Sequence, residues 1–213
     1  MKCDKNHMLL YGVTDRMWLS GRTLAHDVEA ALKGGVTMIQ LREKELNDED
    51  FLTQAFEIKA LCRKYNVPFI INDNVEVAIA CDADGIHVGQ HDMDVLKVRD
   101  RLGSEKIIGI SAQTVEQAKK AVACGADYLG VGAVFTTSTK TDVNVLSTET
   151  LKAICEAVDV PICAIGGIYD YNISHLSGSG IDGVALVSAI FAQDNIKEKT
   201  EQLLKLSKNM VNQ

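Results

Sequence analysis

The segment FTTSTKTD, residues 135–142, places five hydroxyl side chains around a single lysine. It directly follows YLGVGAV, residues 128–134, an apolar run that is typical of a buried strand. Hydroxyls, backbone N–H groups and a lysine ammonium are suitable partners for phosphate oxygens. A surface loop rich in Thr and Ser is the commoner explanation of such a composition. The positions of the other polar residues therefore have to decide between a phosphate site and an ordinary loop.

A second group of cations alternates along QLREK, where Gln40, Arg42 and Lys44 share one parity. In a strand, a period of two directs these three side chains to the same face. Two cations and an amide on one face suit an anionic ligand. The alternative is that Arg42 and Lys44 pair with Glu43 or Glu45 as surface charge.

Two aspartates, Asp73 in INDN and Asp92 in GQHD, follow the next two apolar runs. Hard carboxylate oxygens beside an anion site suit Mg²⁺ that is shared with a diphosphate. A single Asp before a helix more often caps that helix, so capping is the alternative for each of them.

The elements that must position these residues are short apolar runs rich in Val, Ile and Leu. The runs are continuous, as in strands buried on both faces, and lie at residues 8–15, 38–44, 69–74, 85–90, 107–112, 128–134, 162–168 and 183–190. Helix-like segments lie between them, most clearly at 48–66, 114–125 and 147–158, and most weakly at 75–82. Eight strands alternating with helices predict a compact (β/α)8 TIM barrel, a single α/β domain over residues 1–213. A doubly wound open sheet is the alternative, but no GxGxxG follows a strand.

A faint internal repeat supports a repeated βα unit. Residues 80–89, 123–132 and 178–187 share a helix end, small residues, an Asp and then a strand, and residues 32–41 are a looser copy.

In such a barrel the carboxyl ends of the strands carry the chemistry. There, Gly166-Gly167 and Val187-Ser188 suggest a second anion site built from backbone N–H groups, and Ser111 ends a further strand. Close packing of the glycines and helix capping by Ser188 are the alternatives. We interpret His87, inside a strand, as a histidine of the barrel interior.

Composition limits the class of protein. The chain has 213 residues, a net charge of −7 and no run of lysines and arginines, so we expect no nucleic-acid partner. No apolar run is long enough for a membrane span and MKCDKNH is not a secretion signal, so we expect a cytoplasmic protein without a membrane partner. The six cysteines form no CxxC pair and are predicted to be free. A homodimer is possible, because barrel enzymes often pair.

Taken together, the motifs closely resemble the thiamine-phosphate synthase family over residues 9–191. They are QLREK, INDN, GIHVGQHD, GISA, FTTSTKTD, AIGGI and ALVSAI. The resemblance implies a transferase that joins 4-amino-2-methyl-5-hydroxymethylpyrimidine diphosphate to hydroxyethylthiazole phosphate, giving thiamine monophosphate and diphosphate. It also implies Mg²⁺ as cofactor and a dissociative substitution.

The resemblance further implies the site residues. The pyrimidine diphosphate would be bound by Gln40, Leu41, Arg42, Glu43, Lys44, Asn72, Ser111 and Lys140. The thiazole phosphate would be bound by Thr137, Ser138, Thr139, Gly167, Val187 and Ser188, and Mg²⁺ by Asp73 and Asp92. Arg42, Lys44 and Lys140 would be catalytic, because they stabilise charge on the leaving diphosphate.

The chain departs from the family pattern in two places. Ala133 and Thr136 stand where the family's loop commonly has prolines, which predicts a more flexible loop. His91 stands where an acidic residue is common.

Two other functions remain open at this point. A thiazole tautomerase-like enzyme on the same barrel would act on the thiazole phosphate alone and would need a positioned acid–base group. A non-catalytic sensor of phosphate ligands would need an added regulatory segment. Asp73, Asp92 and Lys140 favour the synthase.

Overall fold

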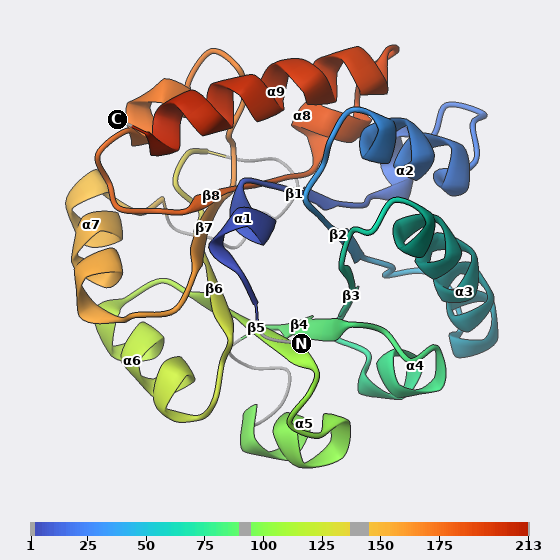
Figure 1. The fold of residues 1–213 in the computed structure, drawn as a ribbon, viewed down its shortest axis with the longest axis horizontal. Helices are drawn as coiled ribbons and strands as arrows, with labels where there is room; N and C mark the ends of the chain where they lie inside the picture. The colour runs from blue at the N-terminus through green and yellow to red at the C-terminus, as the bar shows by residue number, and fades with distance from the viewer. Residues whose placement is uncertain (1–2, 90–94, 137–144, 213) are drawn as a thin grey trace.

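The computed structural model describes residues 3–89, 95–136 and 145–212. In these residues eight parallel strands close into one barrel in the order of the sequence, with helices around it (Figure 1). The barrel closes between the first and last strands, where Tyr11 lies beside Ala185 and Gly12 beside Leu186. The TIM barrel predicted from the apolar runs is therefore confirmed, and the open-sheet alternative is wrong.

All but one of the strands are shorter than the apolar runs that predicted them, because the last residues of those runs leave the sheet at the rim of the barrel. The strands are β1 (Leu10–Val13), β2 (Met38–Leu41), β3 (Phe69–Asn72), β4 (Gly85–Val88), β5 (Ile107–Ala112), β6 (Tyr128–Gly132), β7 (Ile162–Ile165) and β8 (Gly183–Leu186).

The helices form the outer layer, with two short 3-10 helices among them. They are α1 (Lys5–Met8), η1 (Arg16–Trp18), α2 (Leu24–Lys33), α3 (Asp48–Lys64), α4 (Val75–Ala80), α5 (Val95–Leu102), α6 (Val115–Ala123), α7 (Thr148–Ala157), η2 (Ile173–Leu176), α8 (Ser188–Phe191) and α9 (Ile196–Val211). The four helices predicted from sequence are present. At α6, for example, Thr114 accepts a hydrogen bond from the backbone of Gln117 and caps the helix.

Two parts of this layer depart from a regular alternation of strands and helices. Between β7 and β8 the described chain forms only the 3-10 turn η2, in a segment interrupted by glycines and serines. At the start of the chain, α1 lies across the N-terminal mouth of the barrel instead of on its outside (Figure 1). The Met8 carbonyl there lies so close to Gly183 that a Cβ on this glycine would be 2.0 Å from the oxygen.

Alternation along the strands separates two cores. The larger core fills the space between strands and helices, and the smaller one fills the barrel interior. The interior side chains include Tyr11, Met38, Ile70, Tyr128 and Cys163, all almost fully buried. This parity decides which polar residue of each rim segment faces inward.

The internal repeat corresponds to one hydrogen-bonding device at the N-terminal end of the barrel. In each copy, a side chain just before a strand accepts the backbone N–H at or next to the start of the preceding strand. The pairs are Thr37 with Leu10 (2.9 Å), Asp84 with Phe69 (2.8 Å), Asp127 with Ile108 (2.8 Å) and Asp182 with Ile162 (2.9 Å). In each pair the backbone N–H of the Thr or Asp in turn donates to the carbonyl of the same strand residue whose N–H its side chain accepts. We call these four paired contacts the latches.

The residue two positions before each latch side chain has a positive φ: Gly35 (92°), Asp82 (51°), Gly125 (95°) and Gly180 (89°). A left-handed residue ends the helix and turns the chain into the next strand, which explains the small residues of the repeat.

All six cysteines are free, as predicted. Among the described residues, no helix is both long enough and apolar enough to cross a membrane.

Candidate active site

A cavity of about 540 Å³ opens at the carboxyl ends of the strands. Its volume is in the range of small-molecule sites. Polar side chains from β2 to β5 form one wall, and the ends of β7 and β8 form another. Tyr11, Val13, Cys163 and Ala185 lie among the deeper residues that line it. This is the end of the barrel at which the sequence predicted chemistry.

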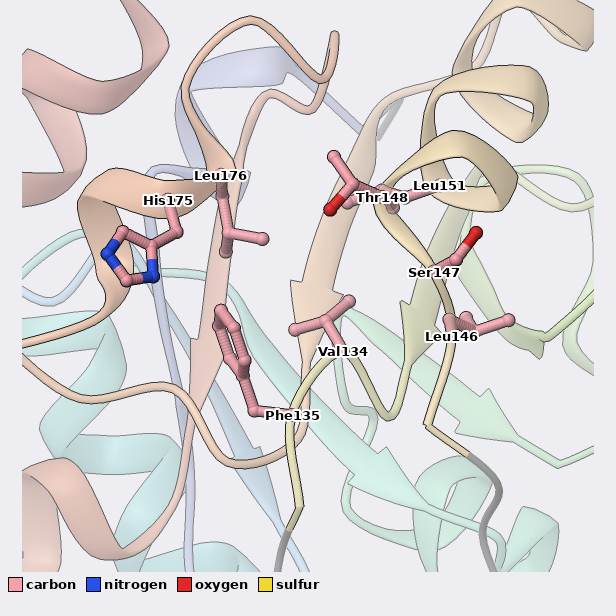
Figure 2. Close-up of a pocket in the computed structure, with 8 residues that line it drawn as sticks. All are labelled: Val134, Phe135, Leu146, Ser147, Thr148, Leu151, His175 and Leu176. Carbon is pink, nitrogen blue, oxygen red and sulfur yellow. The ribbon is translucent and has the colours of Figure 1, made fainter.

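A second hollow, of about 30 Å³, is too small for a substrate, but it shows how the chain is held on either side of residues 137–144 (Figure 2). Val134 and Phe135 lie on one side of it, with Leu146 and Ser147 on another. The Leu146 N–H donates to the Ala133 carbonyl (2.7 Å), and the Phe135 N–H to the Gly166 carbonyl (3.0 Å). One flanking segment is thus fixed beside the end of β7, and the other is fixed to the residue that follows β6.

Four of the predicted residues share one side of the large cavity: Gln40, Arg42, Asn72 and Ser111. We call them the β2–β5 wall. Their inward direction follows from the parity of the strands. Two hydrogen bonds hold Arg42 in place. Its backbone N–H donates to the Thr14 hydroxyl (3.0 Å), and its guanidinium donates to Asp15 (3.1 Å).

Lys44 and Asp73 lie on the rim and pair with each other, at 2.7 Å between Nζ and Oδ2. Asp73 has a φ of 61°, which is uncommon for a residue other than glycine, and it occurs here at the end of a barrel strand. It does not cap α4, because Asn74 accepts the hydrogen bond from the Val77 N–H instead. The capping alternative for Asp73 is therefore wrong.

Two residues of the QLREK segment have the opposite parity. The Leu41 side chain packs in the outer core, so a ligand role would fall to its backbone. Glu43 pairs with Arg16 at 2.8 Å, and its side chain is 2% exposed. Burial raises the pKa of the Glu43 carboxyl, and its Oε1 has no hydrogen-bond partner in the part of the chain that the structure describes.

Gly167, Val187 and Ser188 also line the cavity, as predicted, and we call them the β7–β8 wall. Gly166 and Gly167 have φ values of 99° and 66°. A Cβ on Gly167 would be 2.3 Å from the Thr136 carbonyl oxygen, so only glycine allows this approach.

Two residues that the sequence analysis missed fix this wall. The Asn172 side chain accepts from the Tyr169 N–H (2.8 Å) and donates to the Gly167 carbonyl (2.9 Å). The Tyr169 hydroxyl is 2.8 Å from the Ser188 hydroxyl. The mixed turn sequence after AIGGI gave no periodic signal that singled out either residue.

The sequence analysis also missed Tyr11 and Tyr128, whose hydroxyl groups lie 2.8 Å apart in the barrel interior. Burial raises the pKa of both tyrosines, and likewise that of Cys163, which also lines the cavity. These three groups therefore remain protonated, and none of them is a ready nucleophile. His87 lies in the barrel interior, as predicted, with both ring nitrogens in hydrogen bonds.

The remaining predicted residues lie outside the described residues: Asp92, Thr137, Ser138, Thr139 and Lys140. In the described ranges, no cluster of three or more His, Cys, Asp or Glu is arranged to hold a metal ion. Asp73 is still suited to Mg²⁺, because this ion commonly takes only one or two carboxylates in addition to substrate phosphates.

Comparison with known proteins agrees with this geometry. A family model described as thiamine monophosphate synthase matches residues 10–190. The thiamine-phosphate synthase of Alkaliphilus oremlandii is 50% identical over 201 residues, covering 93% of this chain and 96% of that protein. The thiamine-phosphate synthase of Persephonella marina is 44% identical over 206 residues, covering 97% of this chain and 99% of that protein. A solved structure of thiamine phosphate pyrophosphorylase from Pyrococcus furiosus matches with a TM-score of 0.90 at 35% identity, covering 97% of this chain and 98% of that one. The resemblance seen in the motifs is confirmed, and the chain belongs to the thiamine monophosphate synthase family.

Proposed function

We propose that this chain joins 4-amino-2-methyl-5-hydroxymethylpyrimidine diphosphate to hydroxyethylthiazole phosphate, releasing diphosphate and forming thiamine monophosphate. The observation that carries the proposal is the two-walled cavity. The β2–β5 wall offers side-chain donors for one anionic substrate, and the β7–β8 wall offers a backbone turn for another.

We assign the pyrimidine diphosphate to the β2–β5 wall and the rim next to it. Arg42 is held toward the cavity by Asp15 and Thr14, so its guanidinium is positioned before the ligand arrives. Lys44 would exchange its ion pair with Asp73 for the diphosphate, and Lys140 would add a third cation. The thiazole phosphate is assigned to the β7–β8 wall together with Thr137, Ser138 and Thr139.

In the proposed reaction, the bond from the pyrimidine methylene carbon to the diphosphate oxygen breaks, and diphosphate leaves with the electron pair. The three cations stabilise the negative charge that develops on the leaving group. The thiazole nitrogen then forms a bond to the same carbon, held close by its own phosphate. No protein nucleophile is needed, in agreement with the raised pKa of the Cys163 thiol.

Mg²⁺ is proposed as the cofactor. Asp73 and Asp92 would hold it together with the diphosphate oxygens, and when bound it would add positive charge that favours departure of the diphosphate.

The test is diphosphate release measured with both substrates, with each alone, and with and without Mg²⁺. Release that requires both substrates and Mg²⁺ is expected. No release despite tight binding of the thiazole phosphate would contradict the proposal and favour a tautomerase or a sensor.

A further inference from the structure

Five side chains form a row of hydrogen bonds across the barrel interior, beneath the mouth of the cavity. In order they are Gln40, Tyr11, Tyr128, His87 and Ser111, and the successive distances are 2.6, 2.8, 2.9 and 3.0 Å. We call this row the interior chain. Its two ends belong to the β2–β5 wall, whereas the three middle residues have no role in the proposed function.

The fold makes room for the interior chain with two glycines. A Cβ on Gly109 would be 2.0 Å from the Tyr128 ring, and a Cβ on Gly130 would be 3.1 Å from the His87 ring. Glycine inside a strand costs stability, so a close approach by another group is its usual reason. Here the groups that approach are two members of the chain.

The protons of the interior chain are linked. Because burial raises the pKa of Tyr11 and Tyr128, each hydroxyl keeps its single proton. A hydroxyl that accepts from one neighbour then donates to the other, so the direction of one bond determines the next. When the Gln40 amide nitrogen donates to Tyr11, Tyr11 donates to Tyr128, and Tyr128 donates to Nδ1 of His87.

A neutral His87 that accepts at Nδ1 carries its proton on Nε2 and donates it to the Ser111 hydroxyl. The opposite direction requires a flipped Gln40 amide, a proton on Nδ1, and a Ser111 hydroxyl that donates to His87.

We propose that the interior chain runs from Gln40 to Ser111, so that it presents an acceptor to the aminopyrimidine and a donor to the diphosphate. In this direction the Gln40 carbonyl oxygen points away from Tyr11 and is available to the exocyclic amino group. Ser111 accepts from His87 and uses its own proton as a donor. The opposite direction would place a donor against the amino group and an acceptor against the diphosphate, which has only acceptors.

It follows that Tyr11, Tyr128 and His87 are positioning residues, which act through Gln40 and Ser111. Both this role and the choice of direction rest on the proposed function, but the direction can be measured in the free protein without any substrate. The two parts are therefore tested separately.

The first test is the tautomer of His87 in the free, full-length protein, measured by NMR with ¹⁵N-labelled histidine at neutral pH. The chain has five histidines, so the His87 signals are assigned by replacing each of the others in turn. A proton on Nε2 and a bare Nδ1 are expected. A proton on Nδ1 would overturn the proposed direction, whatever the activity of the enzyme.

The second test is Tyr128→Phe, which keeps the ring and removes the central hydroxyl. The Kd of the pyrimidine diphosphate, measured by calorimetry without the thiazole substrate, should rise about tenfold to a hundredfold, as for a lost hydrogen bond of 1.5–3 kcal/mol. The Kd of the thiazole phosphate should stay unchanged, and the preference of His87 for Nε2–H should weaken.

Tyr65→Phe is the matched control. This substitution also removes a tyrosine hydroxyl, which donates to Glu29 at 3.1 Å. Both residues lie in the outer helical layer, away from the cavity. The substitution should leave both Kd values unchanged. Unaltered pyrimidine binding in Tyr128→Phe, or equal losses for both substrates, would refute the positioning role. If wild type shows the Nε2–H tautomer but binds neither substrate, the proposed function fails while the direction of the chain stands. If Tyr128→Phe does not fold, the wild-type tautomer still decides the direction.

Discussion

Replacing Asn172 by alanine tests how the β7–β8 wall is held together. The Asn172 amide bridges two backbone groups of the turn after β7, the Tyr169 N–H and the Gly167 carbonyl. The residue is 8% exposed, so water has little access to replace these bonds. Leaving a buried polar group without a partner costs about 1–3 kcal/mol, so two such groups predict a loss of about 2–6 kcal/mol in the free energy of unfolding.

The same substitution should weaken binding of the thiazole phosphate. Gly167 has a φ of 66° and its carbonyl accepts from Asn172, so loss of this bond should let the turn shift and misalign its N–H donors. Loss of one hydrogen bond to a charged phosphate, about 1.5–3 kcal/mol, corresponds to a rise in Kd of roughly tenfold to a hundredfold. The Kd of the pyrimidine diphosphate should not change.

Urea denaturation and calorimetry with each substrate measure these quantities. Ser207→Ala is the matched control, because its buried hydroxyl donates to the Leu9 carbonyl at the opposite end of the barrel. This control should lose stability and keep both affinities. If Asn172→Ala bound the thiazole phosphate as tightly as the wild type does, the turn would not depend on Asn172 and the reasoning would be refuted.

Three further predictions concern the rim, the latches and the metal. Lys140→Ala should reduce turnover far more than it weakens thiazole phosphate binding; equal losses in kcat and in affinity would contradict a role on the leaving group. Asp84→Ala removes the acceptor of the Phe69 N–H and should lower the free energy of unfolding by about 1–3 kcal/mol in urea denaturation, with kcat and KM unchanged. A changed KM there would show that the latches also shape the site. Removal of divalent cations with a chelator should abolish diphosphate release, and Mg²⁺ should restore it, whereas full activity in the chelator would exclude the metal set of Asp73 and Asp92.

The sequence predicted the barrel because short, continuous apolar runs are typical of parallel strands that are buried on both faces. It could not predict η2, since the segment between β7 and β8 lacks the regular apolar spacing of a helix and is shaped by contacts such as that between Asn172 and Gly167. Strand ends were also overestimated, because residues such as Arg42 continue the parity of a strand after its hydrogen-bond ladder has ended.

In the site, parity correctly placed Gln40 and Arg42 in the cavity. The family pattern assigned the whole QLREK segment, but a pattern does not distinguish the inward Arg42 from Glu43, which is directed to Arg16. The interior chain had one usable signal: Gly109 and Gly130, two glycines at inward positions of neighbouring strands, indicate that bulky groups from elsewhere fill the space. The partners themselves are set by the register of the barrel, which sequence alone does not give.

The latches group the eight strands of the barrel into pairs. They join β1 to β2, β3 to β4, β5 to β6 and β7 to β8, and so tie the strands into four consecutive pairs. The two prolines of the chain, Pro68 and Pro161, stand immediately before β3 and β7, the first strands of two of these pairs. The barrel thus consists of four units of two consecutive strands, and a latch joins the two strands of each unit. New chain termini placed between two units, for instance beside Pro68, would leave the strands of every latch connected in sequence. New termini within a unit would break the chain connection between two strands that a latch joins.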